Sequence, residues 1–102
     1  MIKKIYVSGP YRSSTEWGVE DNIRRAEVSA VKLWQEGYAV FCPHKNSAHL
    51  GGIVPDNIFL AGDLEILKRF DIIFMLKGWE QSIGACIELH IAQEHCLEVM
   101  YE

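Results

Sequence analysis

The sequence predicts a three-layer α/β domain built on a short parallel sheet, flavodoxin-like or Rossmann-like in architecture. Segments rich in β-branched and aromatic residues alternate with segments of helical period, in the order β-α-β-α-β-α-β. That alternation is typical of a parallel sheet covered by helices on both faces. The third strand segment contains the run IIFML, which is apolar throughout, as expected of a strand buried on both faces.

The first half of the chain is expected to form two strands, a helix and a long loop. Residues 3–8 are rich in β-forming residues and end before a Gly-Pro pair, so they predict the first strand. A helical period runs through residues 19–36, with acidic residues in its first turn and a glycine after its end. Residues 38–42 predict the second strand. The glycine-containing stretch 44–56 predicts a loop, and loops of that length are often functional.

The second half of the chain continues the alternation of helices and strands. Asp56 is expected to cap a helix over residues 57–69, and a strand follows over residues 71–76. A third helix is predicted over residues 81–95 and a short strand over residues 97–101. Right-handed crossovers then give the strand order 2-1-3-4 and place the second and third helices side by side on one face. Ligand sites in such sheets lie beyond the carboxyl ends of the strands, here between the first and third strands.

Length and composition favour a single soluble domain over residues 1–102. The formal net charge of −4 disfavours long nucleic acid as a partner, because binding to the phosphate backbone needs a basic surface. No apolar run is long enough for a membrane span or a secretory signal, so no membrane partner and a cytoplasmic location are expected. The three cysteines are scattered and form no CxxC, which indicates reduced thiols.

The predicted helix over residues 81–95 carries a carboxylate, Glu88, in the middle of its apolar face. At about 100° per residue, Gly84, Ala85, Ile91 and Ala92, all small or apolar, lie within about 60° of it on the helical wheel. Helices normally bury that face, and burial of an unpaired carboxylate is costly and raises its pKa. Glu88 is therefore expected to gain hydrogen-bond partners or to line a cavity. The hydroxyl of Tyr6, in the central strand, is a candidate partner; a tyrosine simply packed in the core is the alternative.

The predicted helix over residues 57–69 shows the same anomaly at Asp63, whose helical-wheel neighbours are also apolar. Either acid alone is explained by hydrogen bonds that tie down a loop. Two acids near the carboxyl ends of the strands, aimed at one crevice, favour a functional site. Carboxyl groups with different pKa values let one pocket supply a nucleophile and a proton donor. In retaining glycosidic chemistry one carboxylate attacks the anomeric carbon and the other protonates the leaving group.

Two further segments are predicted to border the same crevice. In the loop SGPYRSS, Gly9 allows close approach of the backbone to a ligand, and Arg12 is suited to bidentate anion binding. A solvated surface arginine is the alternative. Ser82 begins the third helix, where free backbone N–H groups attract anions, although a serine there also serves as an ordinary helix cap. Neither a Walker loop nor GxGxxG is present, so a dinucleotide fingerprint is not supported.

Other residues carry weaker hypotheses. Cys42, His44 and His49 raise the possibility of zinc, but they supply only three ligands, and nothing marks the cysteine as an activated nucleophile. Trp17 and Trp79 are expected in loops at the mouth of the crevice, where they could stack on a flat base or serve a dimer contact. No metal or other cofactor is expected.

Three stretches together, IYVSGPYR, GDLEILKRFDIIFML and SIGACIELHIA, resemble the nucleoside 2-deoxyribosyltransferase superfamily. That group includes the 2′-deoxynucleoside 5′-monophosphate N-hydrolases and small phage and bacterial relatives. The resemblance covers nearly the whole chain. Its most specific part is a D-L-x-x-L segment, an acid before a buried strand, and then S-x-G-x-x-x-E.

The resemblance implies a role for each matching residue. Glu88 takes the place of the nucleophile that attacks the sugar C1′. Asp63 matches the acid that helps to protonate or hold the leaving base, and Tyr6 matches the tyrosine that orients the nucleophile. Asp71 also matches an acid of the pattern, but a cap at the turn between helix and strand explains it, and it stays outside the catalytic set.

The remaining matches concern the substrate. Ser82 and Gly84 match the helix start that binds the 5′-phosphate in the monophosphate hydrolases. Gly9 and Arg12 match a G-x-x-R arrangement whose arginine faces that phosphate. The chain is shorter than most members of the superfamily and lacks their last strand and helix. Since a neighbouring subunit often completes the pocket in that superfamily, a homodimer is expected.

The sequence therefore predicts an enzyme that cleaves the N-glycosidic bond of a (2′-deoxy)nucleoside 5′-monophosphate, with transfer of the sugar to water or to another base. One alternative is a nucleotide sensor that binds in the same pocket without catalysis. Others are a hydrolase of NAD or similar ribosyl nucleotides and a small redox or flavin-binding domain. Ile87 and His90 stand where many relatives have other residues, so the base and the sugar stay open.

Overall fold

The centre of the molecule is a sheet of four parallel strands in the order β2-β1-β3-β4, as predicted. The computed structural model describes all residues, Met1–Glu102. The strands are β1 (Lys4–Ser8), β2 (Ala39–Phe41), β3 (Ile72–Met75) and β4 (Glu98–Tyr101). The predicted α/β class and strand order are therefore confirmed, and the architecture is consistent with a flavodoxin-like fold.

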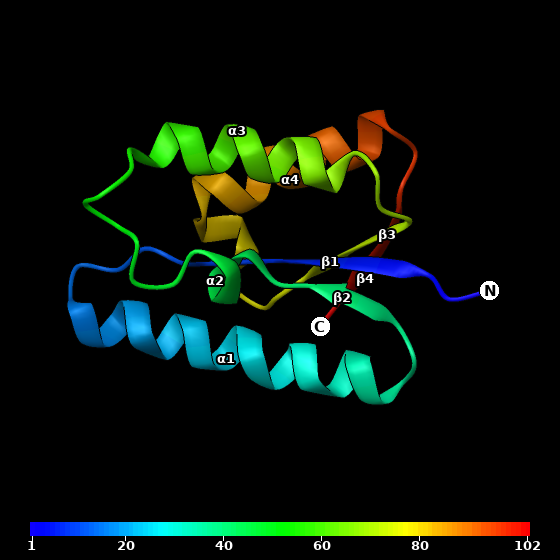
Figure 1. Cartoon of the computed structure of the whole chain (residues 1–102), viewed down its shortest axis with the longest axis horizontal. Helices are drawn as coiled ribbons and strands as arrows, with labels where there is room; N and C mark the ends of the chain where they lie inside the picture. Colours follow the sequence, from blue (N-terminus) through cyan, green and yellow to red (C-terminus); the bar gives the residue numbers. More distant parts are fainter.

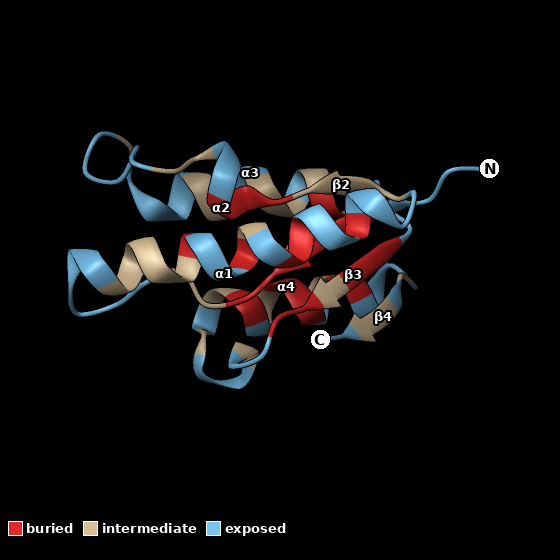
Figure 2. Ribbon diagram, turned by 90° about the horizontal axis from the view of Figure 1, so that it is seen from below, coloured by how far each residue is buried: buried red, intermediate tan, exposed pale blue.

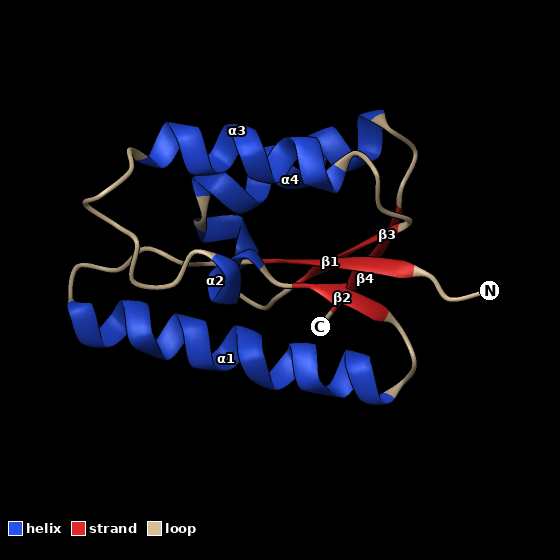
Figure 3. Ribbon diagram, in the orientation of Figure 1, coloured by secondary structure: helices blue, strands red, loops and turns tan.

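Helices cover the sheet on both faces (Figures 1 and 3). One face carries α1 (Glu16–Gln35), and the other carries α3 (Asp56–Leu67) beside α4 (Ile83–Glu94). Two short elements complete the chain, α2 (Pro43–Asn46) and the 3-10 helix η1 (Trp79–Gln81). No helix combines the length and the apolar character that crossing a membrane requires.

The side chains on the two faces of β1 belong to two separate hydrophobic cores. Successive side chains of a strand point to opposite faces. Ile5 and Val7 pack in the core under α1, whereas Tyr6 packs in the core under α3 and α4. Ser8 has the same parity as Tyr6 and points to the same side. Figure 2 shows this burial concentrated in the central strands and in the inner faces of the helices.

Three local predictions need correction. The first helix begins three residues earlier than expected, because the side chain of Thr15 accepts a hydrogen bond from the Gly18 N–H at 2.9 Å and caps it. Part of the expected loop 44–56 is the short helix α2, which starts at a proline, a residue suited to a first helical turn. Asp56 does not cap α3: Pro55 precedes the helix, and Asp56 is its first residue.

Candidate functional site

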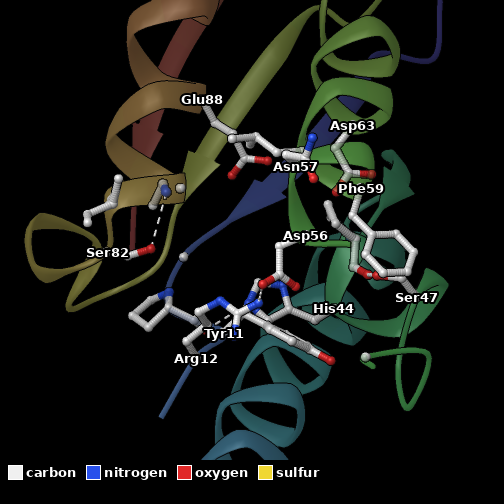
Figure 4. Close-up of a pocket in the computed structure, with 18 of the residues that line it drawn as sticks. Tyr11, Arg12, His44, Ser47, Asp56, Asn57, Phe59, Asp63, Ser82 and Glu88 are labelled. Atoms are coloured by element: carbon white, nitrogen blue, oxygen red, sulfur yellow. Dashed lines mark hydrogen bonds and ion pairs between the residues drawn. The ribbon is translucent and has the colours of Figure 1, made fainter. Parts of the chain in front are cut away.

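A cavity of about 610 Å³ lies at the carboxyl ends of the strands, where the sequence predicted a crevice. Four segments border it (Figure 4). They are the loop after β1, the region of α2, the first two turns of α3 and the beginning of α4. The cavity volume is in the range of small-molecule sites. Its lining includes six of the seven residues predicted from sequence: Gly9, Arg12, Asp63, Ser82, Gly84 and Glu88.

Glu88 lies at the inner end of the cavity and is held by two hydroxyl groups. Its residue surface is only 8% exposed. The Tyr6 hydroxyl donates a hydrogen bond to Oε2, and the Ser8 hydroxyl donates to Oε1 at 2.7 Å. The contact between Tyr6 and Glu88 was suggested by the sequence, and the structure shows it. Since both carboxyl oxygens have a donor, the side chain is oriented from β1 while it borders the cavity.

Burial dominates the protonation of Glu88. Desolvation raises its pKa from 4.5 to about 7, against the two hydrogen bonds from Tyr6 and Ser8, which lower it. The negative charge of Asp63 raises the pKa further. Burial beside two acids also raises the pKa of Tyr6, so its phenol stays protonated and acts as a donor. Glu88 is thus a carboxyl group whose charge changes near neutral pH.

Asp63 borders the same cavity from α3 (Figure 4). Partial burial raises the pKa of Asp63 from 3.8 to about 6, and no hydrogen bond or ion pair within the chain opposes that shift. The carboxyl group is therefore free to interact with a ligand. The cavity holds two carboxyl groups whose pKa values are both raised and differ from each other, a pattern associated with acid–base chemistry.

The Arg12 side chain is exposed to solvent, but it is not an unoccupied anion receptor. Its guanidinium forms an ion pair with the carboxylate of Asp56, across the cavity between the loop after β1 and the start of α3 (Figure 4). Both side chains border the cavity, and each is more than half exposed. An anion that takes a bidentate position including Nη2 of Arg12 must therefore displace Asp56.

The start of α4 forms another part of the cavity wall. The Ser82 hydroxyl accepts a hydrogen bond from the Ala85 N–H at 3.2 Å, so it caps the helix as expected of a serine there. A side chain at Gly84 would meet no protein atom within 4 Å, and Gly84 borders the cavity. This glycine is not required by packing, so its lack of a side chain leaves space for a ligand.

Gly9 has a packing role that the sequence did not predict. It borders the cavity, but a β-carbon at this position would lie 2.6 Å from Cβ of Leu76 and 2.7 Å from its Cδ1. Leu76 is buried in the core under α1. The structure therefore explains Gly9 first by close packing of the β1 end against Leu76, because that contact leaves no room for a side chain.

His44, in α2, connects its wall of the cavity to the loop after β1 by a hydrogen bond. It is 4% exposed, and its Nε2 lies 2.8 Å from the carbonyl oxygen of Pro10. Since a carbonyl only accepts, Nε2 carries the proton, and burial lowers the pKa of the ring, which keeps it neutral. The zinc hypothesis for Cys42, His44 and His49 is not supported, because no three His, Cys, Asp or Glu side chains are grouped closely enough to share a metal ion.

The two tryptophans are not among the residues that border the cavity, so the structure does not support stacking on a base, and a dimer contact stays the alternative. Trp17 lies in the first turn of α1 and is 76% exposed. Trp79 lies in η1 and packs against Tyr101, with ring centroids 6.1 Å apart. Neither residue is placed to contact a ligand of the cavity.

Several residues of the site, Ser8 behind Glu88 and others that line the cavity, were missed by sequence reasoning. Ser8 could have been found, because it stands two residues after Tyr6 in a strand and therefore shares its face. Asp56 was interpreted only as a cap. Tyr11, Asn57 and Phe59 also border the cavity, but no sequence pattern distinguishes them from ordinary loop and helix residues.

Comparison with known proteins identifies the family. A family model described as "Domain of unknown function (DUF4406)" matches residues 3–101. No match was found among curated proteins. Because the matched region includes every strand and helix of the structure, the chain belongs to the DUF4406 family, a domain family of unknown function.

Proposed function

We propose that this protein cleaves the N-glycosidic bond of a nucleoside 5′-monophosphate, and of a 2′-deoxy one in particular, with Glu88 as nucleophile. The observation that carries the proposal is the setting of Glu88. Its carboxyl group is buried, is oriented by Tyr6 and Ser8, and borders a cavity that it shares with Asp63. The similarity of the sequence to the nucleoside 2-deoxyribosyltransferase superfamily supports the same assignment.

In the first step, an ionised oxygen of Glu88 attacks C1′ of the sugar. The bond between C1′ and the base nitrogen breaks, and its electron pair goes to the base. Protonated Asp63 donates its proton to the leaving base, which is why a pKa of about 6 suits it better than that of an ordinary aspartate. The product is a glycosyl ester on Glu88 and a free base.

In the second step, a water molecule or another base attacks C1′ and releases Glu88 as a carboxylate. Asp63, now ionised, accepts the proton of the attacking group, as in retaining glycosidases. Tyr6 and Ser8 hold the carboxyl group in one orientation through both steps. Water as acceptor makes the protein a hydrolase, and a base as acceptor makes it a transferase.

The 5′-phosphate is assigned to Arg12 and to the start of α4 at Ser82 and Gly84. Arg12 offers bidentate hydrogen bonds to phosphate, and the free N–H groups at a helix start favour an anion.

Dimerisation is also proposed, and sedimentation equilibrium tests it. The exposed apolar side chain of Ile83, at the rim of the cavity, is consistent with a second copy nearby.

The test is a panel of substrates. The protein is incubated with nucleosides, ribonucleoside and 2′-deoxyribonucleoside 5′-monophosphates and NAD, each with and without an acceptor base. Free base and exchanged nucleoside are measured by chromatography. Release of base from monophosphates, and not from NAD, is expected. A protein that binds monophosphates but releases no base from any of them is a sensor, and that result would refute the proposal.

Two variants sharpen the test. Glu88→Gln keeps the size and the hydrogen bonds of the side chain but removes the nucleophile, so base release is expected to fall by at least about 1,000-fold. Glu80→Gln is the matched control, because Glu80 is exposed and makes no ion pair. It should leave the rate unchanged. Release that survives Glu88→Gln undiminished would overturn the assignment of the nucleophile.

A further inference from the structure

We propose that Asp56 acts as an internal substitute for the substrate's phosphate. Its carboxylate pairs with Arg12 until a phosphate-bearing ligand displaces it. The inference rests on the proposed function in assigning a phosphate to this cavity. It adds a residue that no sequence pattern assigned, and it states what that residue does to the affinity of the site.

The geometry places Asp56 where a ligand anion would compete with it. Arg12 belongs to the loop after β1, and Asp56 is the first residue of α3, so the pair joins two walls of the cavity (Figure 4). Both side chains border the cavity into which Glu88 points. A guanidinium that is occupied by a carboxylate is an anion site already filled by the protein's own anion.

Because both side chains of the ion pair are exposed, a ligand anion can readily replace Asp56 at Arg12. The side chains of Arg12 and Asp56 are 68% and 63% exposed. Ion pairs with this much solvent around them change an equilibrium constant by at most about fivefold, because water screens the attraction. The carboxylate can return to solvent when Arg12 leaves. At the first turn of α3 its charge also stays favoured by the helix dipole.

A phosphate group competes well for Arg12. A phosphate dianion carries more charge than a carboxylate and accepts two parallel hydrogen bonds from one guanidinium. In the cavity it also gains the N–H groups at the start of α4, beside Ser82 and Gly84, which Asp56 on α3 does not use. A phosphate that makes two parallel hydrogen bonds including Nη2 of Arg12 must break the pair, so Asp56 weakens phosphate binding by a fixed factor and speeds release of a phosphorylated product.

The proposal predicts the outcome of a double-mutant cycle. The probe is 2-deoxyribose 5-phosphate, which carries the phosphate but has no glycosidic base to lose, with inorganic phosphate as a second ligand. Affinities are measured by titration calorimetry for the unchanged chain, Asp56→Asn, Arg12→Gln and the double variant. Asp56→Asn is expected to lower the Kd by about two- to fivefold. Arg12→Gln should raise it at least tenfold.

The cycle separates the ion pair from general charge effects. In the Arg12→Gln background, Asp56→Asn should change the Kd less than twofold, because the competition is gone. Glu16→Gln is the matched control: it also removes an exposed acid from a first helical turn, in α1, and should have no effect. Thermal unfolding of each variant checks that the exposed substitutions leave the fold intact.

Three results would overturn the proposal: a Kd that Asp56→Asn leaves unchanged or raises, an equal gain from Asp56→Asn without Arg12, or a Kd that Arg12→Gln does not raise. Failure of the proposed function looks different. If the cycle behaves as expected while no nucleotide loses its base, the phosphate site stands and catalysis is refuted. If bases are released but the cycle fails, only the role of Asp56 is wrong.

Discussion

Replacement of Glu88 by glutamine should stabilise the fold at alkaline pH while it removes activity. Burial raises the pKa of Glu88 from 4.5 to about 7, so the folded chain holds this proton more tightly than the unfolded chain does. The free energy of unfolding must then fall as the pH rises from about 4.5 to about 7. One pKa unit corresponds to about 1.4 kcal/mol, which makes the loss about 3 kcal/mol.

Glutamine avoids this loss because it is never charged. Its amide can accept the hydrogen bond from Tyr6 and donate one to Ser8, so neither hydroxyl is left without a partner. At pH 8 the Glu88→Gln variant should therefore be more stable by about 2–3 kcal/mol, which for a domain of this size raises Tm by about 10 °C or more. At pH 4 the two chains should differ by less than about 0.5 kcal/mol, because Glu88 is then protonated in both states.

The assay is urea unfolding of both chains at several pH values and at one protein concentration, followed by circular dichroism. Glu80→Gln is the control and should show no pH-dependent difference from the unchanged chain, since its side chain is exposed. If Glu88→Gln is no more stable at pH 8 than the unchanged chain, or if the difference does not vary with pH, Glu88 is not a buried acid of raised pKa and the reasoning fails.

Three further predictions concern the cavity. Base release should show a bell-shaped pH dependence with its maximum between pH 6 and pH 7, because it needs Glu88 ionised (pKa about 7) and Asp63 protonated (pKa about 6), a form that is a minor fraction of the protein at every pH. The acid limb then follows the lower of the two pKa values and the alkaline limb the higher, so Asp63→Asn should abolish the alkaline limb and leave a single limb that reports the ionisation of Glu88. Tyr6→Phe removes a hydrogen bond that lowers the pKa of Glu88, so the alkaline limb of the kcat/KM profile, which follows the higher of the two pKa values, should move to higher pH; an unmoved alkaline limb would contradict the role of the phenol. Gly9→Ala should destabilise the fold by about 1–3 kcal/mol through its contact with the Leu76 side chain, whereas Gly84→Ala should keep or raise the unfolding midpoint, because alanine favours a helix, and should weaken binding of a monophosphate; calorimetry and urea unfolding distinguish the two glycines.

The sequence predicted the strand order and the position of the cavity because both depend on patterns that a single chain displays. An apolar strand between helical segments indicates a parallel sheet, and an acid on an apolar helix face indicates that a partner or a cavity lies opposite. Glu88 and Asp63 were found in this way. The parity of β1 would also have identified Ser8, since it shares the face of Tyr6.

Other features depend on which segments come together in space, and no local sequence pattern predicts those contacts. The pair between Arg12 and Asp56 joins residues on either side of the cavity, so it depends on the path of both loops. The packing of Gly9 against Leu76 depends on the detailed approach of one loop to the end of β3. Trp79 was expected near a ligand, but its contact with the last strand places it elsewhere.

The most direct test of the proposed mechanism is detection of the covalent bond between the sugar and Glu88. The protein would be mixed with a monophosphate that carries fluorine at C2′, which disfavours the oxocarbenium-like transition state and slows hydrolysis of a glycosyl ester. After an acid quench, peptide mass spectrometry should find the sugar phosphate on the peptide from α4 that contains Glu88, with one equivalent of base released. Release of base with the sugar on another residue, or with the protein mass unchanged throughout, would contradict nucleophilic catalysis by Glu88.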